Sequence, residues 1–196
     1  MERRGYLSAG PFVPEVVLEH PEVVTQLHKE FIRAGSDVVQ AFTYYGHREK
    51  LRIIGKEDML EPLQKNALKI AKDAANEFKD LDLMVCGDVA NTNVFDPGDA
   101  STHKQCQKMY EEQVAWAKEA GVDFVIAETI NWTEEMKIAL KAVKDAGLIA
   151  VCNFAIPRGD KTREGHTAED ACKMMEDLGA DVVLSLIHIS EPTRPY

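Results

Sequence analysis

A short pattern recurs four times along the chain and constrains the fold more than any other feature. Each copy has a charged residue, a small or apolar residue, Gly, and then a run of β-branched or apolar residues. The copies are RAGSDVVQAF at 33–42, EAGVDFVIAE at 119–128, DAGLIAVCNF at 145–154 and DLGADVV at 177–183. The Gly is expected to end a helix in the left-handed conformation, and the run after it is apolar on both faces, as a covered strand must be. The pattern therefore predicts the helix-to-strand joints of a parallel sheet.

A fifth strand is expected at LDLMVCGD, 81–88, which lacks the Gly but has the same continuous apolar character. Helices are expected at 60–78, 103–120, 134–146 and 167–178. Thr133 is the expected N-cap of the third helix, and TAED at 167–170 has the spacing of a capping box.

Five strands alternating with helices make an α/β protein, and two architectures accept that order: an open doubly wound sheet, or part of a (β/α)₈ TIM barrel. The chain begins with a helix-sized segment that no strand precedes, and it ends just after a strand begins. Five strands can complete an open sheet but not a barrel, so the length favours the open sheet, while the way the chain starts and stops favours the partial barrel.

Composition excludes several classes of protein. A chain of 196 residues with 45% hydrophobic residues can bury a core, while its net charge of -10 opposes binding to nucleic acid and to anionic membranes. The longest apolar runs are strand-sized, far below the length of a membrane span. The four cysteines lie far apart without a CxxC pair, which favours reduced thiols and a cytoplasmic protein.

Ligands of both architectures bind at the carboxyl ends of the strands, where polar residues interrupt the apolar runs. These polar residues are Gln40, Thr43, Tyr44, Tyr45 and His47, then Asp88, Asn91 and Thr92, then Glu128, and then Asn153. Glu128 is the strongest candidate, because a carboxylate at the end of a buried strand is costly unless it is paired. A substrate ammonium group would pair with it, and the alternative is a structural ion pair with a loop Lys or Arg.

Aromatic side chains gather around the end of the first strand. Phe12, Phe42, Tyr44 and Tyr45 could form a cage for a quaternary ammonium or sulfonium group. Core packing is the alternative, and we prefer it for Phe42. If the chain is extended at Tyr44 and Tyr45, the two rings point to opposite faces and at most one reaches a pocket.

The histidines and cysteines show no metal-ligand spacing, and the HExxH, GxGxxG, GxxxxGK[ST] and GxSxG motifs are absent. Cys86 and Cys152 fall on expected strands, and Cys106 and Cys172 fall on expected helices, where packing explains them.

The run ERRGYLSAGPFVPEVVLEHPEVVTQLHKEFIRAGSDVVQAFTYYGHREKL resembles the segment after the first barrel strand in the homocysteine S-methyltransferase family, close to its betaine–homocysteine branch. GVDFVIAETI and EDLGADVV resemble the family's fourth and sixth strand regions, so the resemblance covers roughly residues 2–183. It implies a (β/α)₈ barrel, of which this chain would be a part covering about strands 2 to 6. It also implies the transfer of a methyl group from a small donor to the sulfur of homocysteine, giving methionine. It also implies a zinc ion held by three cysteine thiolates, one after the sixth strand and a pair after the eighth.

The resemblance assigns roles to several positions. Glu128 aligns with the acid that holds the substrate amino group, Tyr45 with a tyrosine near the reacting groups, and Thr43 and Tyr44 with the same FT[FY]Y pattern. Phe12 and Thr129 fall where betaine-using members carry Trp and a second Tyr. Phe offers a weaker cation–π face than Trp, so the donor stays open among betaine, S-methylmethionine or similar molecules.

The zinc cysteines of the family would lie beyond the end of the resemblance. We therefore expect zinc in the full-length parent and none in this chain, which we expect to be an inactive fragment of a methionine-biosynthesis enzyme. Its partners would be homocysteine and a small methyl donor, and a homo-oligomeric parent stays open. The alternative is a complete five-strand open α/β domain that binds a small ligand or a partner without catalysis.

Residues 1–183 are therefore expected to be a partial homocysteine-binding barrel. The closing LSLIHISEPTRPY, 184–196, looks like a translated sequencing adapter and is expected to be a non-native tail. Its alternating apolar and polar residues could still lengthen the last strand.

Overall fold

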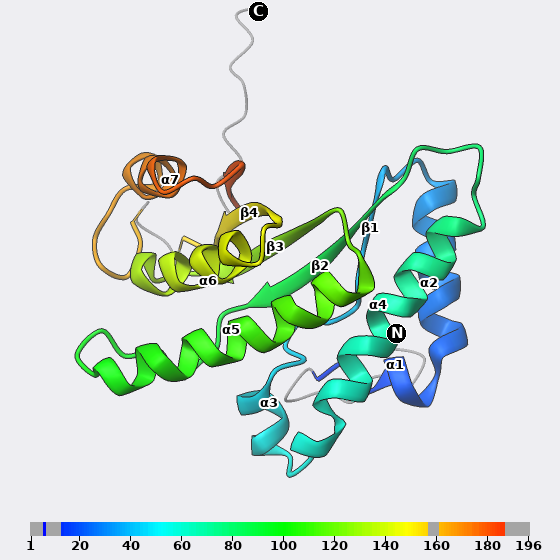
Figure 1. The fold of residues 1–196 in the computed structure, drawn as a ribbon, viewed down its shortest axis with the longest axis horizontal. Helices are drawn as coiled ribbons and strands as arrows, with labels where there is room; N and C mark the ends of the chain where they lie inside the picture. The colour runs from blue at the N-terminus through cyan, green and yellow to red at the C-terminus, as the bar shows by residue number, and fades with distance from the viewer. Residues whose placement is uncertain (1–5, 7–12, 157–160, 187–196) are drawn as a thin grey trace, which may run out of the picture.

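The computed structural model describes residue 6 and residues 13–156 and 161–186, in which helices and parallel strands alternate (Figure 1). The elements are α1 Val16–Glu19, α2 Pro21–Arg33, β1 Val38–Gln40, α3 Arg48–Ile53, the 3₁₀ helix η2 Glu57–Met59, α4 Leu60–Asn76, β2 Met84–Ala90, α5 Ala100–Ala120, β3 Phe124–Ile130, α6 Thr133–Asp145, β4 Ile149–Phe154, α7 Ala168–Asp177 and β5 Val182–Ser185. None of the helices in these ranges is long and apolar enough to cross a bilayer.

The five strands form one parallel sheet in the order β1-β2-β3-β4-β5. A doubly wound sheet reverses its strand order at a switch point, and this sheet has no reversal among its described strands. Each strand pairs with the next one along the chain, as in a (β/α)₈ barrel. The expected partial barrel is confirmed, and the doubly wound alternative is wrong.

The helix-to-strand joints have the backbone that the repeated pattern predicts. The four joint glycines all have positive φ, namely Gly35, Gly121, Gly147 and Gly179. The α7 cap is also confirmed, since Thr167 Oγ1 accepts a hydrogen bond of 3.1 Å from the Asp170 amide. The expected cap at Thr133 is wrong, because Thr133 is the first helical residue of α6 and Trp132 precedes it as N-cap.

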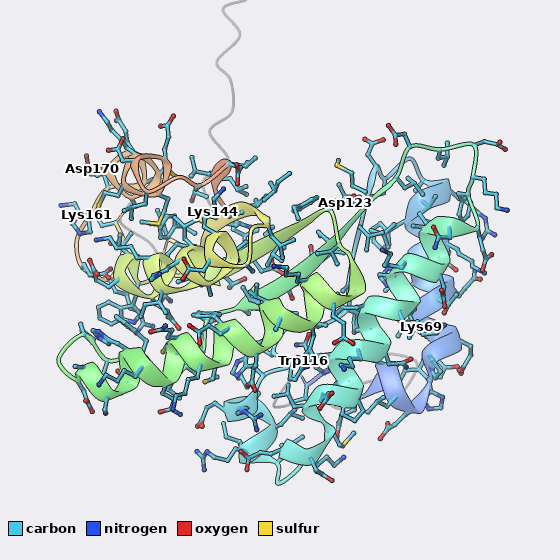
Figure 2. All side chains as sticks on the ribbon, in the orientation of Figure 1. Lys69, Trp116, Asp123, Lys144, Lys161 and Asp170 are labelled. Carbon is cyan, nitrogen blue, oxygen red and sulfur yellow. The ribbon has the colours of Figure 1, made fainter. Side chains whose placement is uncertain are left out.

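The aspartate that follows two of these glycines fastens each joint to the preceding strand. Asp123 Oδ2 accepts a 2.6 Å hydrogen bond from the Val85 amide, and Figure 2 labels Asp123 just before β3. Asp181 Oδ2 accepts a 2.8 Å bond from the Ala150 amide and pairs with Lys144 at 2.8 Å. These bonds lower the pKa of Asp181, the Ala150 amide most and Lys144 next. Each joint therefore sets the register of a strand pair.

The sheet has two distinct faces. On the outer face, strand residues such as Val39, Val125 and Cys152 join the main hydrophobic core with side chains of the covering helices, for example Tyr110 and Met136. The inner face carries the alternate residues of each strand. Its polar side chains lie toward the carboxyl ends of the strands, and these ends position the candidate site.

Candidate functional site

Four polar side chains lie on the inner face toward the carboxyl ends of β1 to β4. The register pairs Glu128 with Ala90 on one side and with Asn153 on the other. Gln40 pairs with Cys86, and Asp88 lies one step along the same face of β2. Parallel pairing therefore gathers four groups on one face: the Gln40 amide of β1, the Asp88 carboxyl group of β2, the Glu128 carboxyl group of β3 and the Asn153 amide of β4.

Glu128 is fixed by a neutral partner. The Gln40 side-chain amide donates a 2.8 Å hydrogen bond to Glu128 Oε1 across the sheet. No Lys, Arg or His in the described part of the chain forms an ion pair with Glu128. An amide does not neutralise a carboxyl group as Lys or Arg would, so the geometry does not support the structural ion pair that was the alternative for this residue.

The backbone bends sharply directly after Glu128. The pairing of β3 with β4 shifts register between Glu128 and Ile130, and Thr129 between them has a φ of 61°. A β-branched residue rarely adopts this left-handed conformation, which costs about 1–3 kcal/mol. Backbone strain of this kind concentrates at functional sites, and here it turns the chain immediately beside the carboxylate.

Asp88 is a buried acid with no compensating partner. Its side chain is 3% exposed, and neither carboxyl oxygen accepts a hydrogen bond from the described residues. Burial raises the pKa of Asp88 well above its ordinary value, and the negative charge of Glu128 raises it further. Thr43 lies beside it and donates a 3.1 Å hydrogen bond to the Asp88 backbone carbonyl. Thr43 therefore joins the loop after β1 to the second strand of the site.

Tyr44 and Tyr45 do not have the extended backbone that would send their rings to opposite faces. Tyr45 has a φ of 58°, and the two ring centroids lie 4.3 Å apart at an angle of 40°. Lys50 Nζ lies 4.1 Å from the centroid of the Tyr45 ring, in cation–π geometry. The Tyr45 ring thus already faces a cation of the chain itself.

Tyr44 lies close to the acid of the site. Burial raises the pKa of the Tyr44 hydroxyl, the Thr129 side chain lowers it by hydrogen bonding, and the Glu128 charge raises it. Tyr44 and Gln40 also line a cavity of about 380 Å³ along the edge of β1, together with His28 and Phe42. Phe42 packs against the cluster around Val17 and Val24, which agrees with the packing role preferred for it.

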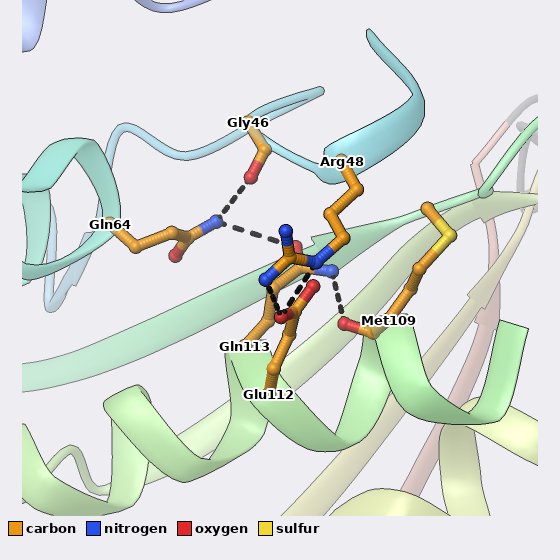
Figure 3. A network of polar contacts seen from close by, with 6 residues as sticks. All are labelled: Gly46, Arg48, Gln64, Met109, Glu112 and Gln113. Carbon is orange, nitrogen blue, oxygen red and sulfur yellow. Dashed lines mark hydrogen bonds and ion pairs between the residues drawn. The ribbon is translucent and has the colours of Figure 1, made fainter. Parts of the chain in front are cut away.

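The turn that carries the tyrosines is anchored from two helices (Figure 3). Gln64 on α4 donates a 2.6 Å hydrogen bond to the Gly46 carbonyl and a 3.3 Å bond to Gln113 on α5. Gln113 in turn donates to the Met109 carbonyl at 2.7 Å, so its amide is held as well. Beside it Arg48 makes two hydrogen bonds with Glu112.

A second buried network fastens the loop after β2, and sequence reasoning missed its central residue. Glu135 Oε1 accepts hydrogen bonds from the Thr92 amide at 2.8 Å, the Thr92 hydroxyl at 2.6 Å and the Tyr110 hydroxyl at 3.1 Å. Burial raises the pKa of Glu135, while these hydrogen bonds act against the rise. The sequence places Glu135 only in the first turn of a helix, and the partners on other elements are visible only in the fold.

The loops after β2, β3 and β4 meet through side-chain stacking. The Phe95 ring lies 4.7 Å from His103 and 5.8 Å from Trp132, measured between centroids. Arg163 lies over the Trp132 ring at 5.6 Å. These contacts bring three consecutive strand-to-helix loops together at the carboxyl-end side of the sheet.

The cysteines of the described chain do not form a zinc site. Cys86, Cys106 and Cys152 are buried, Cys172 is partly buried, and all four are free thiols. Burial raises the pKa of Cys86 and of Cys152 to about 12, and that of Cys106 to about 11. Zinc requires thiolates gathered around one point, and no group of three His, Cys, Asp or Glu side chains within the described ranges could hold a metal ion.

The structure places the expected site residues as follows. Glu128 lies at the carboxyl end of β3, and Thr43, Tyr44 and Tyr45 lie in the loop after β1. Phe12 and the tail from 187 onward lie outside the described residues. Asp88 and Asn153 were readable in the sequence as polar interruptions of apolar runs. Only the register shows that Asn153 lies beside Glu128 and that Asp88 lies one step back on the adjoining strand, on the same face.

Comparison with known proteins identifies relatives over nearly the whole chain. Betaine–homocysteine S-methyltransferase 1 from Sus scrofa is 34% identical over 188 residues, covering 93% of this chain and 65% of that protein. The Rattus norvegicus protein of the same name is 36% identical over 198 residues, covering 98% of this chain and 47% of its own length. The chain thus spans about half to two thirds of the length of these curated relatives.

The fold has a solved counterpart. The homocysteine methyltransferase MmuM from Escherichia coli, in its metallated form, superimposes with a TM-score of 0.79 at 19% identity. The superposition covers 93% of this chain and 69% of that one, and it shows a shared fold. The family model described as homocysteine S-methyltransferase matches residues 2–193. With this match and the curated relatives, the chain belongs to the homocysteine S-methyltransferase family.

Proposed function

We propose that this chain carries the amino-acid-binding part of a methyltransferase site, at which a small donor gives a methyl group to the sulfur of homocysteine and methionine is formed. Family membership supports the reaction class, and the relatives' names specify betaine and homocysteine. The observation that carries the proposal is Glu128, an acid on the inner face whose partner is the neutral Gln40 amide. Such a carboxylate suits the ammonium group of an amino acid.

The site residues have separate roles in this proposal. Glu128 binds the ammonium group of homocysteine, and Gln40 holds the carboxylate in position. Tyr44 and Tyr45 cover the same end of the sheet and limit the access of water to the reacting sulfur. Transfer of a methyl group needs sulfur, carbon and leaving group in line, so fixing the amino acid at one end contributes to catalysis by orientation.

The donor remains a small methylated cation such as betaine or S-methylmethionine. The Tyr44 ring lies close enough to Glu128 for its hydroxyl to respond to the Glu128 charge, and the Tyr45 ring packs against it. We propose Phe12 as a third aromatic contact to the donor, on the family resemblance alone.

Activation of the sulfur needs a group that the described residues do not supply. A homocysteine thiol is mostly protonated at neutral pH, and a bound zinc ion would supply the thiolate form. The four described cysteines do not fit a zinc site. We therefore propose that thiolates from elsewhere in the parent protein hold the zinc, and that this chain binds homocysteine without turnover.

Calorimetric titration of the 196-residue chain with L-homocysteine tests this proposal. Loss of a charged hydrogen-bond partner costs about 1.5–3 kcal/mol, so E128Q should weaken binding roughly 10- to 100-fold. E176Q makes the same chemical change at an exposed residue of α7 and should bind like the wild type. Equal affinity of E128Q and wild type would contradict the role of Glu128, and methyl transfer by the chain alone would contradict the need for outside thiolates.

A further inference from the structure

Buried acceptor oxygens without donors surround Glu128. Asp88 and Asn153 are each 3% exposed. Both carboxyl oxygens of Asp88 and the Oδ1 atom of Asn153 have no hydrogen-bond partner among the described residues. A buried polar atom left in this state costs about 1–3 kcal/mol. Three acceptors with no donor on one face point to a ligand that brings N–H groups.

The two carboxyl groups can satisfy each other only with a proton between them. Two ionised carboxylates have no donor, so neither oxygen of Asp88 can bond to Glu128 in that state. A proton on Asp88 lets its hydroxyl donate to Glu128, whose Oε1 atom also accepts from Gln40. Burial and the charge of Glu128 both raise the pKa of Asp88, which favours this protonated form.

The other groups near Asp88 do not compete for this proton. Cys86, on the same strand, has a pKa raised to about 12, first by burial and then by the charge of Asp88. Thr43 and Gln40 on the β1 side are uncharged, and burial raises the pKa of Tyr44. On the β3 side the facing ionisable group is Glu128. Among the groups named here, Asp88 is therefore the one at which the surroundings favour a proton that a ligand can displace.

We propose that Asp88 shares a proton with Glu128, and that this pair, together with Asn153 Oδ1, forms a site selective for a primary ammonium group. The identity of the ligand as an amino acid rests on the proposed function. In the free protein the pair with one proton carries a single negative charge, and an ammonium group that brings N–H donors favours further negative charge on Asp88. A quaternary ammonium group has no N–H and would leave the acceptors of Asp88 and Asn153 unpaired.

Binding should release part of the Asp88 proton to solvent. The ammonium charge stabilises ionised Asp88, so the complex holds fewer protons than the free protein. Affinity must then rise with pH, up to the pH at which free Asp88 has ionised. We expect a gain in affinity of roughly tenfold over that range.

Calorimetry with two matched probes tests selectivity and proton release. L-methionine has the primary ammonium group, and N,N,N-trimethyl-L-methionine has the same side chain without N–H groups. We expect the wild-type chain to bind L-methionine about tenfold more tightly at pH 8.5 than at pH 6, and to bind the trimethyl compound at least about tenfold more weakly at either pH.

Variants of Asp88 separate the effect of its proton on ligand binding from the effect of its side-chain packing. D88A removes the acceptor and should weaken L-methionine binding about tenfold at pH 6. D88N supplies an N–H to Glu128 in place of the acid proton, so it should recover most of that loss and show no rise of affinity with pH. D80N makes the same change at an exposed aspartate and should keep the wild-type pH dependence.

Carboxyl ¹³C NMR of the free chain gives an independent reading, with the Asp88 signal identified by its absence in D88N. We expect Asp88 to remain protonated at pH 6, where an ordinary aspartate of pKa about 3.9 is ionised. Ionised Asp88 at pH 6, a wild-type pH slope in D88N, equal binding of both probes, or no binding of L-methionine would each overturn the proposal. None of these readings requires methyl transfer. Methyl transfer by the chain alone would count against the proposed function and leave the proton-sharing pair standing.

Discussion

At the scale of single residues, the position of Glu128 depends on its neighbour as much as on its strand. Thr129 turns the backbone with a φ of 61°, where the register between β3 and β4 shifts. The side chain of Thr129 also contacts the Tyr44 hydroxyl. One strained residue thus connects the acid of the site with the tyrosine turn on the other side of Asp88.

Replacing Thr129 by Gly should stabilise the fold, because Gly adopts positive φ without a steric cost. We expect T129G to raise the free energy of unfolding by up to about 1 kcal/mol, measured by urea denaturation. T129A is the matched control, since it removes the same hydroxyl contact but keeps the Cβ atom, and it should not be more stable than the wild type. A T129G variant less stable than T129A would show that Thr129 is not strained.

At the scale of elements, the loop after β1 is held in place by two helices, α4 and α5. Gln64 and Gln113 bring α4 and α5 to the Gly46 carbonyl, as Figure 3 shows. The close approach leaves no room for a side chain at Gly46. A Cβ atom there would lie 2.9 Å from the Thr43 carbonyl oxygen and 3.0 Å from Leu63 Cδ2. The turn is therefore part of the core packing and not a free surface loop.

A methyl group at Gly46 should loosen this turn. We expect G46A to lower the free energy of unfolding by about 1–3 kcal/mol, because the clash involves backbone that cannot move aside cheaply. G98A is the control, since its nearest contact is the exposed Asp96 carboxylate at 3.3 Å, and it should unfold like the wild type. Urea denaturation measures both variants, and equal stability of G46A and G98A would contradict the tight packing of the turn.

Local signals in the sequence predicted the elements well, and contacts between elements could not be read from it. The joint glycines and the Thr167 cap depend only on neighbouring residues, so both were predictable. Thr133, like Thr167, is a residue type that favours the N-cap position, yet its hydroxyl donates a hydrogen bond to the Thr162 hydroxyl in the loop after β4. The positive φ of Tyr45 has no sequence signal, since a non-glycine residue in that conformation depends on its tertiary surroundings.

Glu128 illustrates the same limit within the site. Its place at the end of an apolar run made it a candidate, and the fold places it there. Its hydrogen-bond partner Gln40 and its neighbour Asp88 come from strands about forty or more residues away in the sequence, and pairing register brings them together. Periodicity predicts which face a residue takes, but not which residue of the next strand lies beside it.

At the scale of the whole molecule, the inner face of the sheet changes character from one end to the other. Polar residues occupy the carboxyl ends of the strands, while Met84, Ile149 and Val182 occupy the amino ends of the same face. These three side chains are 44%, 52% and 48% exposed. β1 and β5 are the outer strands of the described sheet. Exposed apolar surface beside open strand edges favours association between copies of a chain.

Lysine at two of these inner-face positions should weaken such association. Burying two half-exposed aliphatic side chains contributes about 2 kcal/mol, so I149K/V182K should associate roughly 30-fold more weakly than the wild type. N76K/Q105K adds the same charge at exposed helix positions of α4 and α5 and serves as the control for the lower net charge. Sedimentation velocity over a series of concentrations measures the effect. If the control weakens association as much as I149K/V182K does, charge alone is responsible and the inner face is not the contact surface.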